Sequence, residues 1–260
     1  MIAVALGVGG AILGWAVGHH GRGTRTVTVA AASTPAGGPV TSAAPTTAAG
    51  ARIDPQVAAG AHIFVQFACA QCHGLQGHGG VSPVVPSLTS VGKTLTPARL
   101  RFIIDHGLGE SKNPTQPYMP VWGEVISRQQ VSDLIAYLRA GLPAVATAEP
   151  PPIPQGQGAA VEGSVLYVRY GCINCHGPNG LGGVPNPLSP DKTIPPLSGK
   201  AFRQQFDTDA KIIAVIRSGS VIGKAPIVSM PHWGGIIPQS QLRALVAYLK
   251  TLRVAPSPNG

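Results

Sequence analysis

Two Cys-x-x-Cys-His strings contain all four cysteines of this 260-residue chain. They read Cys69-Ala70-Gln71-Cys72-His73 and Cys172-Ile173-Asn174-Cys175-His176. This spacing is the attachment signature of c-type haem, because both thiols can add to haem vinyl groups and the histidine that follows can bind the iron. The sequence therefore predicts two covalently bound haem c groups, held by Cys69, Cys72, His73, Cys172, Cys175 and His176.

Other uses of a Cys-x-x-Cys pair fit this chain less well. A zinc site needs four ligands and does not require a histidine directly after each pair. A thioredoxin-like dithiol would follow a strand in a βαβ context, and the sequence shows no such pattern. A disulfide within Cys-x-x-Cys would be strained and would close a trivial loop. We therefore expect haem at both motifs.

Two methionines recur in matching strings downstream of the haem motifs. Met119 and Met230 each open the string Met-Pro-x-Trp-Gly. A methionine is often a flexible core filler, but two fillers would not be expected to recur in one local string of each repeat. The following proline favours a rigid loop. A thioether opposite the histidine is usual where haem iron transfers electrons. We predict Met119 and Met230 as the second iron ligands, which leaves no open site for a substrate.

The remaining histidines downstream of the N-terminal segment are weaker candidates for iron ligands. His232 lies two residues after Met230 and could compete with it, but the first repeat has Val121 at that place. Three others have no histidine counterpart in the second repeat and are expected in loops or at the surface: His62, His78 and His106.

The haem motifs belong to an internal duplication whose conserved pieces predict helices and loops. A helical pattern precedes each motif, and another closes each repeat near Tyr137 and near Tyr248. Ser127 is expected to cap the first closing helix. Ser240 is the candidate cap of the second, although Pro238 leaves its start open. Strand alternation is absent, so the fold class is all-α.

With these motifs in this order, each repeat resembles a class I (mitochondrial-type) cytochrome c domain. The resemblance implies that Gly60 and Phe64 of the first helix meet Tyr137 of the last. Gly163 and Tyr167 would likewise meet Tyr248. Four side chains are candidates to pack around the haems: Leu88, Trp122, Leu197 and Trp233.

The expected organisation is two tandem cytochrome c domains behind an N-terminal anchor and tether. Residues 2–18 are apolar or small and uncharged, at the low end of the length that spans a membrane. An uncleaved anchor is favoured over a signal sequence. The expected divisions are 1–20 (transmembrane anchor or signal sequence), 21–52 (disordered Ala/Thr/Pro-rich tether), 53–142 (first domain), 143–160 (Pro-rich linker), 161–253 (second domain) and 254–260 (tail).

The positive charge is concentrated in the second repeat. Residues 53–142 carry six basic and five acidic side chains, whereas residues 161–253 carry ten and four, a net +6. A solvated surface would explain this excess, and so would docking of an acidic redox partner. We predict that the second domain meets such a partner. Nucleic acid is a poor alternative, because no basic helix or basic–aromatic array is present.

These features predict an electron carrier with no catalytic activity of its own. The resemblance implies a membrane-anchored dihaem cytochrome of a respiratory chain, as a subunit or partner of a quinol-oxidising bc-type complex. Its haem domains would lie on the periplasmic side of the bacterial cytoplasmic membrane. Two alternatives stay open: the electron-accepting subunit of a periplasmic dehydrogenase, and a dihaem peroxidase, which would need a displaceable iron ligand.

Overall fold

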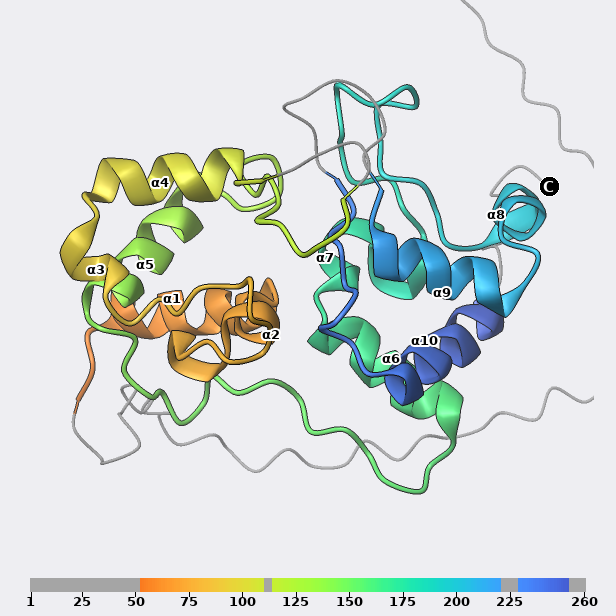
Figure 1. Cartoon of the computed structure of the whole chain (residues 1–260), viewed down its shortest axis with the longest axis horizontal. Helices are drawn as coiled ribbons and strands as arrows, with labels where there is room; N and C mark the ends of the chain where they lie inside the picture. The colour runs from red at the N-terminus through yellow and green to blue at the C-terminus, as the bar shows by residue number, and fades with distance from the viewer. Residues whose placement is uncertain (1–51, 110–113, 221–228, 253–260) are drawn as a thin grey trace, which may run out of the picture. The chain divides into compact units, whose positions relative to one another are not determined.

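Two modules of helices follow one another along the chain (Figure 1). The computed structural model describes residues 52–109, 114–220 and 229–252. The first module consists of α1 (Pro55–Gln66), α2 (Cys69–His73), the 3-10 turn η1 (Leu75–Gly77), α3 (Val91–Thr94), α4 (Pro97–His106) and α5 (Arg128–Arg139). The second consists of α6 (Ala159–Arg169), α7 (Cys172–His176), η2 (Pro178–Gly180), α8 (Gly199–Gln205), α9 (Asp209–Ser218) and α10 (Gln239–Thr251).

The all-α prediction is confirmed for the residues that the structure describes. They contain no strand, only three isolated bridges. Both modules belong to a single compact unit of the chain. No helix in the described ranges is long and apolar enough to cross a membrane. The predicted anchor at 1–20, nearly all of the tether at 21–52, and the tail at 254–260 lie outside those ranges.

Polar caps set the starts of several helices. Asp54 accepts hydrogen bonds from the first backbone amides of α1, and Thr96 and Thr208 cap α4 and α9 in the same way. Ser127 forms the predicted cap of α5, completed by Gln130 as a capping box.

The predicted cap of the closing helix in the second module is wrong. Helix α10 begins at Gln239, so Ser240 lies inside it. Pro238 occupies the cap position, and no side chain satisfies the first amides there. The fixed φ of proline suits the extended residue before a helix, so the helix begins directly after Pro238 although no side chain caps it.

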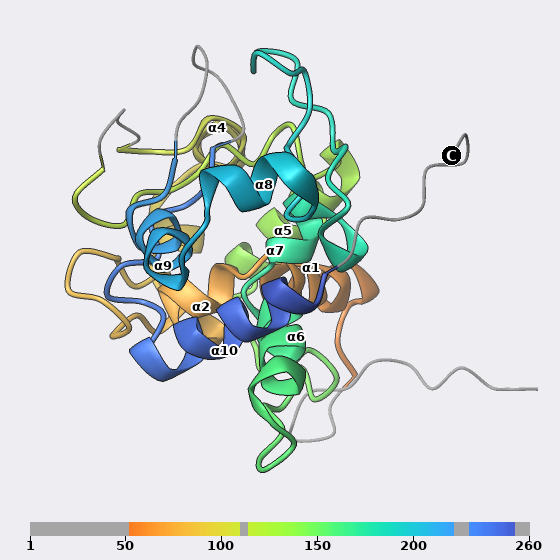
Figure 2. The same ribbon diagram turned by 90° about the vertical axis from the view of Figure 1, so that its right-hand side faces the viewer.

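The first and last helices of each module cross at a glycine. Helix α1 packs against α5, and α6 packs against α10; Figure 2 shows α10 lying across α6. A methyl group on Gly60 would meet the backbone oxygen of Asp133 and the Cβ of Tyr137. A methyl group on Gly163 would meet the backbone oxygen of Ala244 and the Cβ of Tyr248. The aromatic pairs predicted beside these glycines are formed, with ring centroids 5.7 Å apart for Phe64–Tyr137 and 5.4 Å for Tyr167–Tyr248.

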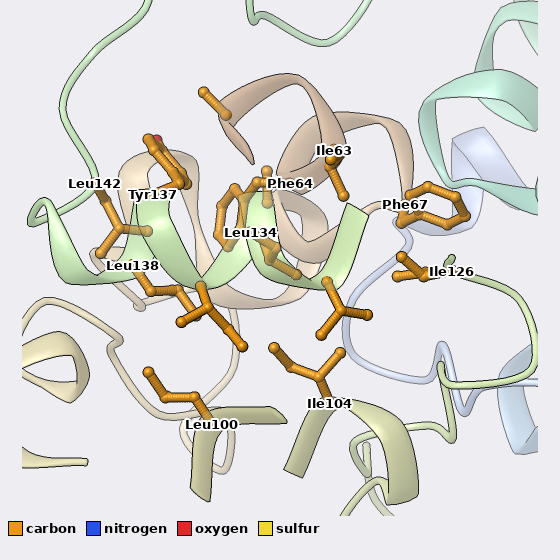
Figure 3. Packing of buried hydrophobic residues seen from close by; sticks show 14 of the residues in the cluster. Ile63, Phe64, Phe67, Leu100, Ile104, Ile126, Leu134, Tyr137, Leu138 and Leu142 are labelled. Carbon is orange, nitrogen blue, oxygen red and sulfur yellow. The ribbon is translucent and has the colours of Figure 1, made fainter. Parts of the chain in front are cut away.

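The core of the first module gathers where α1, α4 and α5 meet. Figure 3 shows Phe64 of α1 and Leu134 of α5 directed toward the same interior as Ile104 of α4. Phe64 and Leu134 are almost fully buried. The second module has an equivalent cluster built around Leu166 and Leu242, both without exposed surface. In each module, the buried cluster therefore holds the first and last helices against each other.

We expect a methyl group at either crossing glycine to destabilise its own module. In Gly60→Ala or Gly163→Ala, the added carbon meets backbone, which cannot rotate away, so the loss should reach about 3 kcal/mol. Val168→Ala, at an exposed position of α6, is the control and should change stability by less than about 1 kcal/mol. Chemical denaturation of the holoprotein measures both. An unchanged midpoint for the glycine variants would contradict the close crossing.

Candidate haem-binding sites

Each Cys-x-x-Cys-His string folds as a single helical turn directly after the first helix of its module. Ala68 and Gly171, just before α2 and α7, adopt left-handed conformations with φ of 59° and 67°. This bend ends the preceding helix, and the motif turn begins directly after it. Because that preceding helix is the one held at the glycine crossing, the crossing also sets the position of the motif.

The four thiols are half-buried and form no disulfide. Burial raises the pKa of Cys69, Cys72 and Cys172 to about 12, and that of Cys175 to about 11. The environment thus favours an uncharged sulfur. A thioether to haem is uncharged, so the thiols fit covalent attachment.

Each motif histidine has one ring nitrogen fixed by a backbone carbonyl. Nδ1 of His73 lies 2.9 Å from the oxygen of Pro86, and Nδ1 of His176 lies 3.1 Å from the oxygen of Pro195. A carbonyl can only accept, so Nδ1 carries the hydrogen and the lone pair is on Nε2. Burial lowers the pKa of both imidazoles, which keeps them neutral. This is the orientation and charge state that a metal-binding histidine requires.

The two methionines lie in short extended segments attached to the ends of α4 and α9. Met119 exchanges two backbone hydrogen bonds with Leu108, each of 2.9 Å. Met230 does the same with Ser220, at 2.8 and 3.0 Å. A glycine of positive φ, Gly107 or Gly219, ends each helix just before the bridge partner of the methionine, and a Cβ there would meet the methionine backbone oxygen.

The expected haem neighbours join these residues at the same cores. Cys69, Leu88, Met119 and Trp122 all pack against the buried cluster of the first module. In the second module, Cys172, Leu197 and Met230 pack against a cluster that includes Trp233. Trp122 packs edge-on against Phe67, and Trp233 packs edge-on against Tyr170. In each repeat, the methionine and the first cysteine of the haem motif therefore pack against the core of their own module, whereas Cys72 packs against the cluster of the second module.

The zinc alternative finds no support in this arrangement. Among the described residues, which include all four cysteines, no three His, Cys, Asp or Glu side chains lie together as a metal site. The two Cys-x-x-Cys pairs are thus not combined into a four-ligand centre.

The other histidines divide into two groups. His62, His78 and His106 are exposed, as predicted. His232 is half-buried, and its Nδ1 is inaccessible and has no hydrogen-bond partner in the described part of the chain. His19 and His20 lie outside the described residues.

The carbonyls that orient the histidines were not identified from the sequence, although a signal was present. Ser87-Leu88 and Pro196-Leu197 are corresponding pairs of the duplication, and each is preceded by proline. Those prolines are Pro86 and Pro195. Their spacing from the histidines differs because of the insertion in the second repeat, which obscures the match.

One contact exists in the second module alone. The hydroxyl of buried Tyr167 donates to the backbone oxygen of Gly177, directly after α7, at 2.7 Å. The corresponding residue of the first module is Phe64, which has no hydroxyl. Burial raises the pKa of Tyr167 above its ordinary value. The turn that carries His176 is therefore tied to α6 by a bond that the first module lacks.

Comparisons with known families agree with the duplication. Residues 55–138 match the family model described as cytochrome c oxidase, cbb3-type, subunit III. Residues 160–253 match the model described as cytochrome c.

Two curated relatives cover part of the chain. A cytochrome c-552 of Acidithiobacillus ferridurans is 26% identical over 121 residues, which are 46% of this chain and 52% of that protein. A thiosulfate dehydrogenase electron acceptor of Thiomonas intermedia (strain K12) is 31% identical over 121 residues, 44% of this chain and 51% of that protein. The matches thus span about half the length of these curated relatives.

A solved chain from the reducing HAO-like protein complex of Kuenenia stuttgartiensis gives a weaker likeness. It is 16% identical, with a TM-score of 0.26 over 78% of this chain and 97% of that chain. At that score the likeness does not inform the fold.

We expect Tyr167→Phe to destabilise the second module by about 1 kcal/mol, the usual net value of one hydrogen bond. Denaturation followed by the absorption of the second haem measures this loss at neutral pH. Because the pKa of Tyr167 is raised on folding, the unfolded phenol ionises first, near pH 10. Its contribution is complete below that pH and is lost above it. The stability of the parent protein should therefore fall more steeply above about pH 10 than that of the variant. Parallel pH profiles would contradict this account.

Proposed function

Because the chain carries two cytochrome c family domains in tandem, and with them two covalent haem c groups, we propose that it is a dihaem electron carrier with two six-coordinate irons. The haem supplies the redox change. The chain's own residues bind each haem, exclude water and fix its potential. With both axial positions taken by protein side chains, the carrier itself has no site at which a substrate could react.

The proposed attachment residues are Cys69 and Cys72 in the first domain, and Cys172 and Cys175 in the second. The proposed axial ligands are His73 with Met119 and His176 with Met230. One observation carries this assignment: in both domains a carbonyl fixes Nδ1 of the histidine, which leaves Nε2 available, and the paired methionine segment packs at the same core.

For the carrier's place in the cell, we propose membrane anchoring through residues 2–18. The haem domains would lie on the periplasmic side of the bacterial cytoplasmic membrane. The preferred electron donor is a quinol-oxidising bc-type complex. Support comes from the apolar N-terminal sequence and from the family resemblance.

A second candidate is the electron-accepting subunit of a periplasmic dehydrogenase. It is favoured by the relative from Thiomonas intermedia, whose name describes an electron acceptor of thiosulfate dehydrogenase. A peroxidase is less well supported, since it needs one displaceable ligand and both domains show the same methionine segment. Affinity purification from gently solubilised membranes, with identification of the co-purifying subunits, separates the first two candidates.

The second domain offers a basic surface for an acidic redox partner. Lys200 and Arg203 are exposed on α8, which has no acidic residue. By contrast, Lys211 and Lys250 of the same domain are already paired, with Asp207 and Asp209. Lys200 and Arg203 form no ion pair within the described residues and are therefore the better candidates for steering a partner.

Substitution of each methionine should affect one haem only. Met119→Ala should remove the long-wavelength methionine-to-iron absorption band of the first haem, and Met230→Ala that of the second. Each should also lower the potential of its haem, because the thioether favours the reduced iron. Optical and redox titrations of the holoprotein check both effects. If neither variant changes the band, the methionine assignment is wrong.

Charge reversal on α8 should slow the reaction with an acidic partner. We expect Lys200→Glu with Arg203→Glu to reduce the association rate at low salt about tenfold or more, and added salt to shrink the difference. Stopped-flow oxidation or reduction by the co-purified partner measures the rate. Lys93→Glu with Arg99→Glu, on the first domain, is the matched control. An equal effect of both pairs, or a rate of the parent protein that does not fall with salt, would refute docking at the second domain.

A further inference from the structure

The residues that precede the two methionines contact one another across the domains. Tyr118 comes directly before Met119, and Ser229 directly before Met230. The hydroxyl of Tyr118 donates to the backbone oxygen of Met230 at 2.6 Å and lies 3.2 Å from Oγ of Ser229. The first domain therefore reaches the methionine segment of the second.

A second contact joins the two haem-attachment segments. Nδ2 of Asn174 donates to the backbone oxygen of Gln66 at 2.8 Å. A Cβ on Gly171 would lie 3.2 Å from the Cβ of Ala68. Ala68 is buried in the hydrophobic cluster of the second domain, and Cys72 packs against that cluster. The link through Tyr118 is thus one part of a packed contact rather than an isolated side-chain bond.

Within the described residues, this side-chain bond supports the methionine segment of the second domain, and the backbone oxygen of Met119 receives no equivalent bond. The backbone oxygen of Met230 accepts from the amide of Ser220 at 3.0 Å and also from Tyr118. The oxygen of Met119 accepts from the amide of Leu108. The residue of the second domain that corresponds to Tyr118 is Ser229, whose side chain is much shorter. The two segments, similar within their own domains, differ in this support.

Given the ligand assignment proposed above, we propose that Tyr118 is a positioning residue that holds Met230 on the iron of the second haem. A carbonyl fixed by two donors restricts the backbone of the residue whose sulfur binds iron, and so restricts the motion by which that sulfur could leave. Ligation of the second haem then depends on a side chain of the first domain, whereas in the described part of the chain the backbone oxygen of Met119 accepts from its own domain alone.

The test is Tyr118→Phe in the full holoprotein, which keeps the ring and removes the hydroxyl. The probe is imidazole, a ligand that suits iron and competes with methionine on the oxidised haem. Its binding is followed through the paramagnetically shifted methyl resonance of each methionine bound to oxidised iron, assigned with Met119→Ala and Met230→Ala. We expect imidazole to displace Met230 about threefold to tenfold more readily in the variant, the effect of one hydrogen bond, and Met119 with unchanged affinity.

Ser229→Ala is the matched control, because it alters the same contact but keeps the bond to the Met230 carbonyl. It should behave as the parent protein. Equal sensitivity of both haems in Tyr118→Phe, sensitivity of the first haem alone, or no change at either haem would overturn the inference. Failure of Met230→Ala to remove the second methyl resonance would instead overturn the ligand assignment, so the two failures are distinguishable.

Discussion

The close crossing of the first and last helices in each domain is the constraint on which the rest of the structure depends. Gly60 and Gly163 allow α1 to lie on α5 and α6 on α10 without a side chain between the backbones. The haem-attachment turns follow directly from α1 and α6, so the crossing decides where the cysteines and histidines lie. A domain of this size has a thin core, and the covalent haem supplies apolar volume that the side chains do not.

The two domains hold their motif histidine and their downstream methionine in the same way but differ in the contacts around them. Both fix their motif histidine through a proline carbonyl and their methionine through a two-bond bridge. The second adds the hydroxyl of Tyr167, the contact from Tyr118 and two exposed cations on α8, Lys200 and Arg203. The two copies thus keep the same geometry around the motif histidine and the methionine, while the contacts around that geometry differ.

Much of the local structure could be predicted, because its signals lie within a few residues of sequence. The capping box at Ser127 is an example, since a serine and a glutamine three residues later are sufficient. Ser240 failed as a cap because Pro238 gave a competing start signal nearby. The carbonyls of Pro86 and Pro195 were not predicted, because the insertion in the second repeat hides the match between the two prolines and residue type does not show where a backbone oxygen points.

By itself, the sequence determined the chemistry of this protein: two thiol pairs with their histidines, two methionine strings and a repeat of helical pieces. Residue type and short spacing suffice for these, because covalent attachment and metal ligation require particular atoms. Only the tertiary structure decided which nitrogen of His73 and His176 is available, and that Tyr118 reaches Met230. Both depend on segments distant along the chain meeting through packing, which no local pattern records.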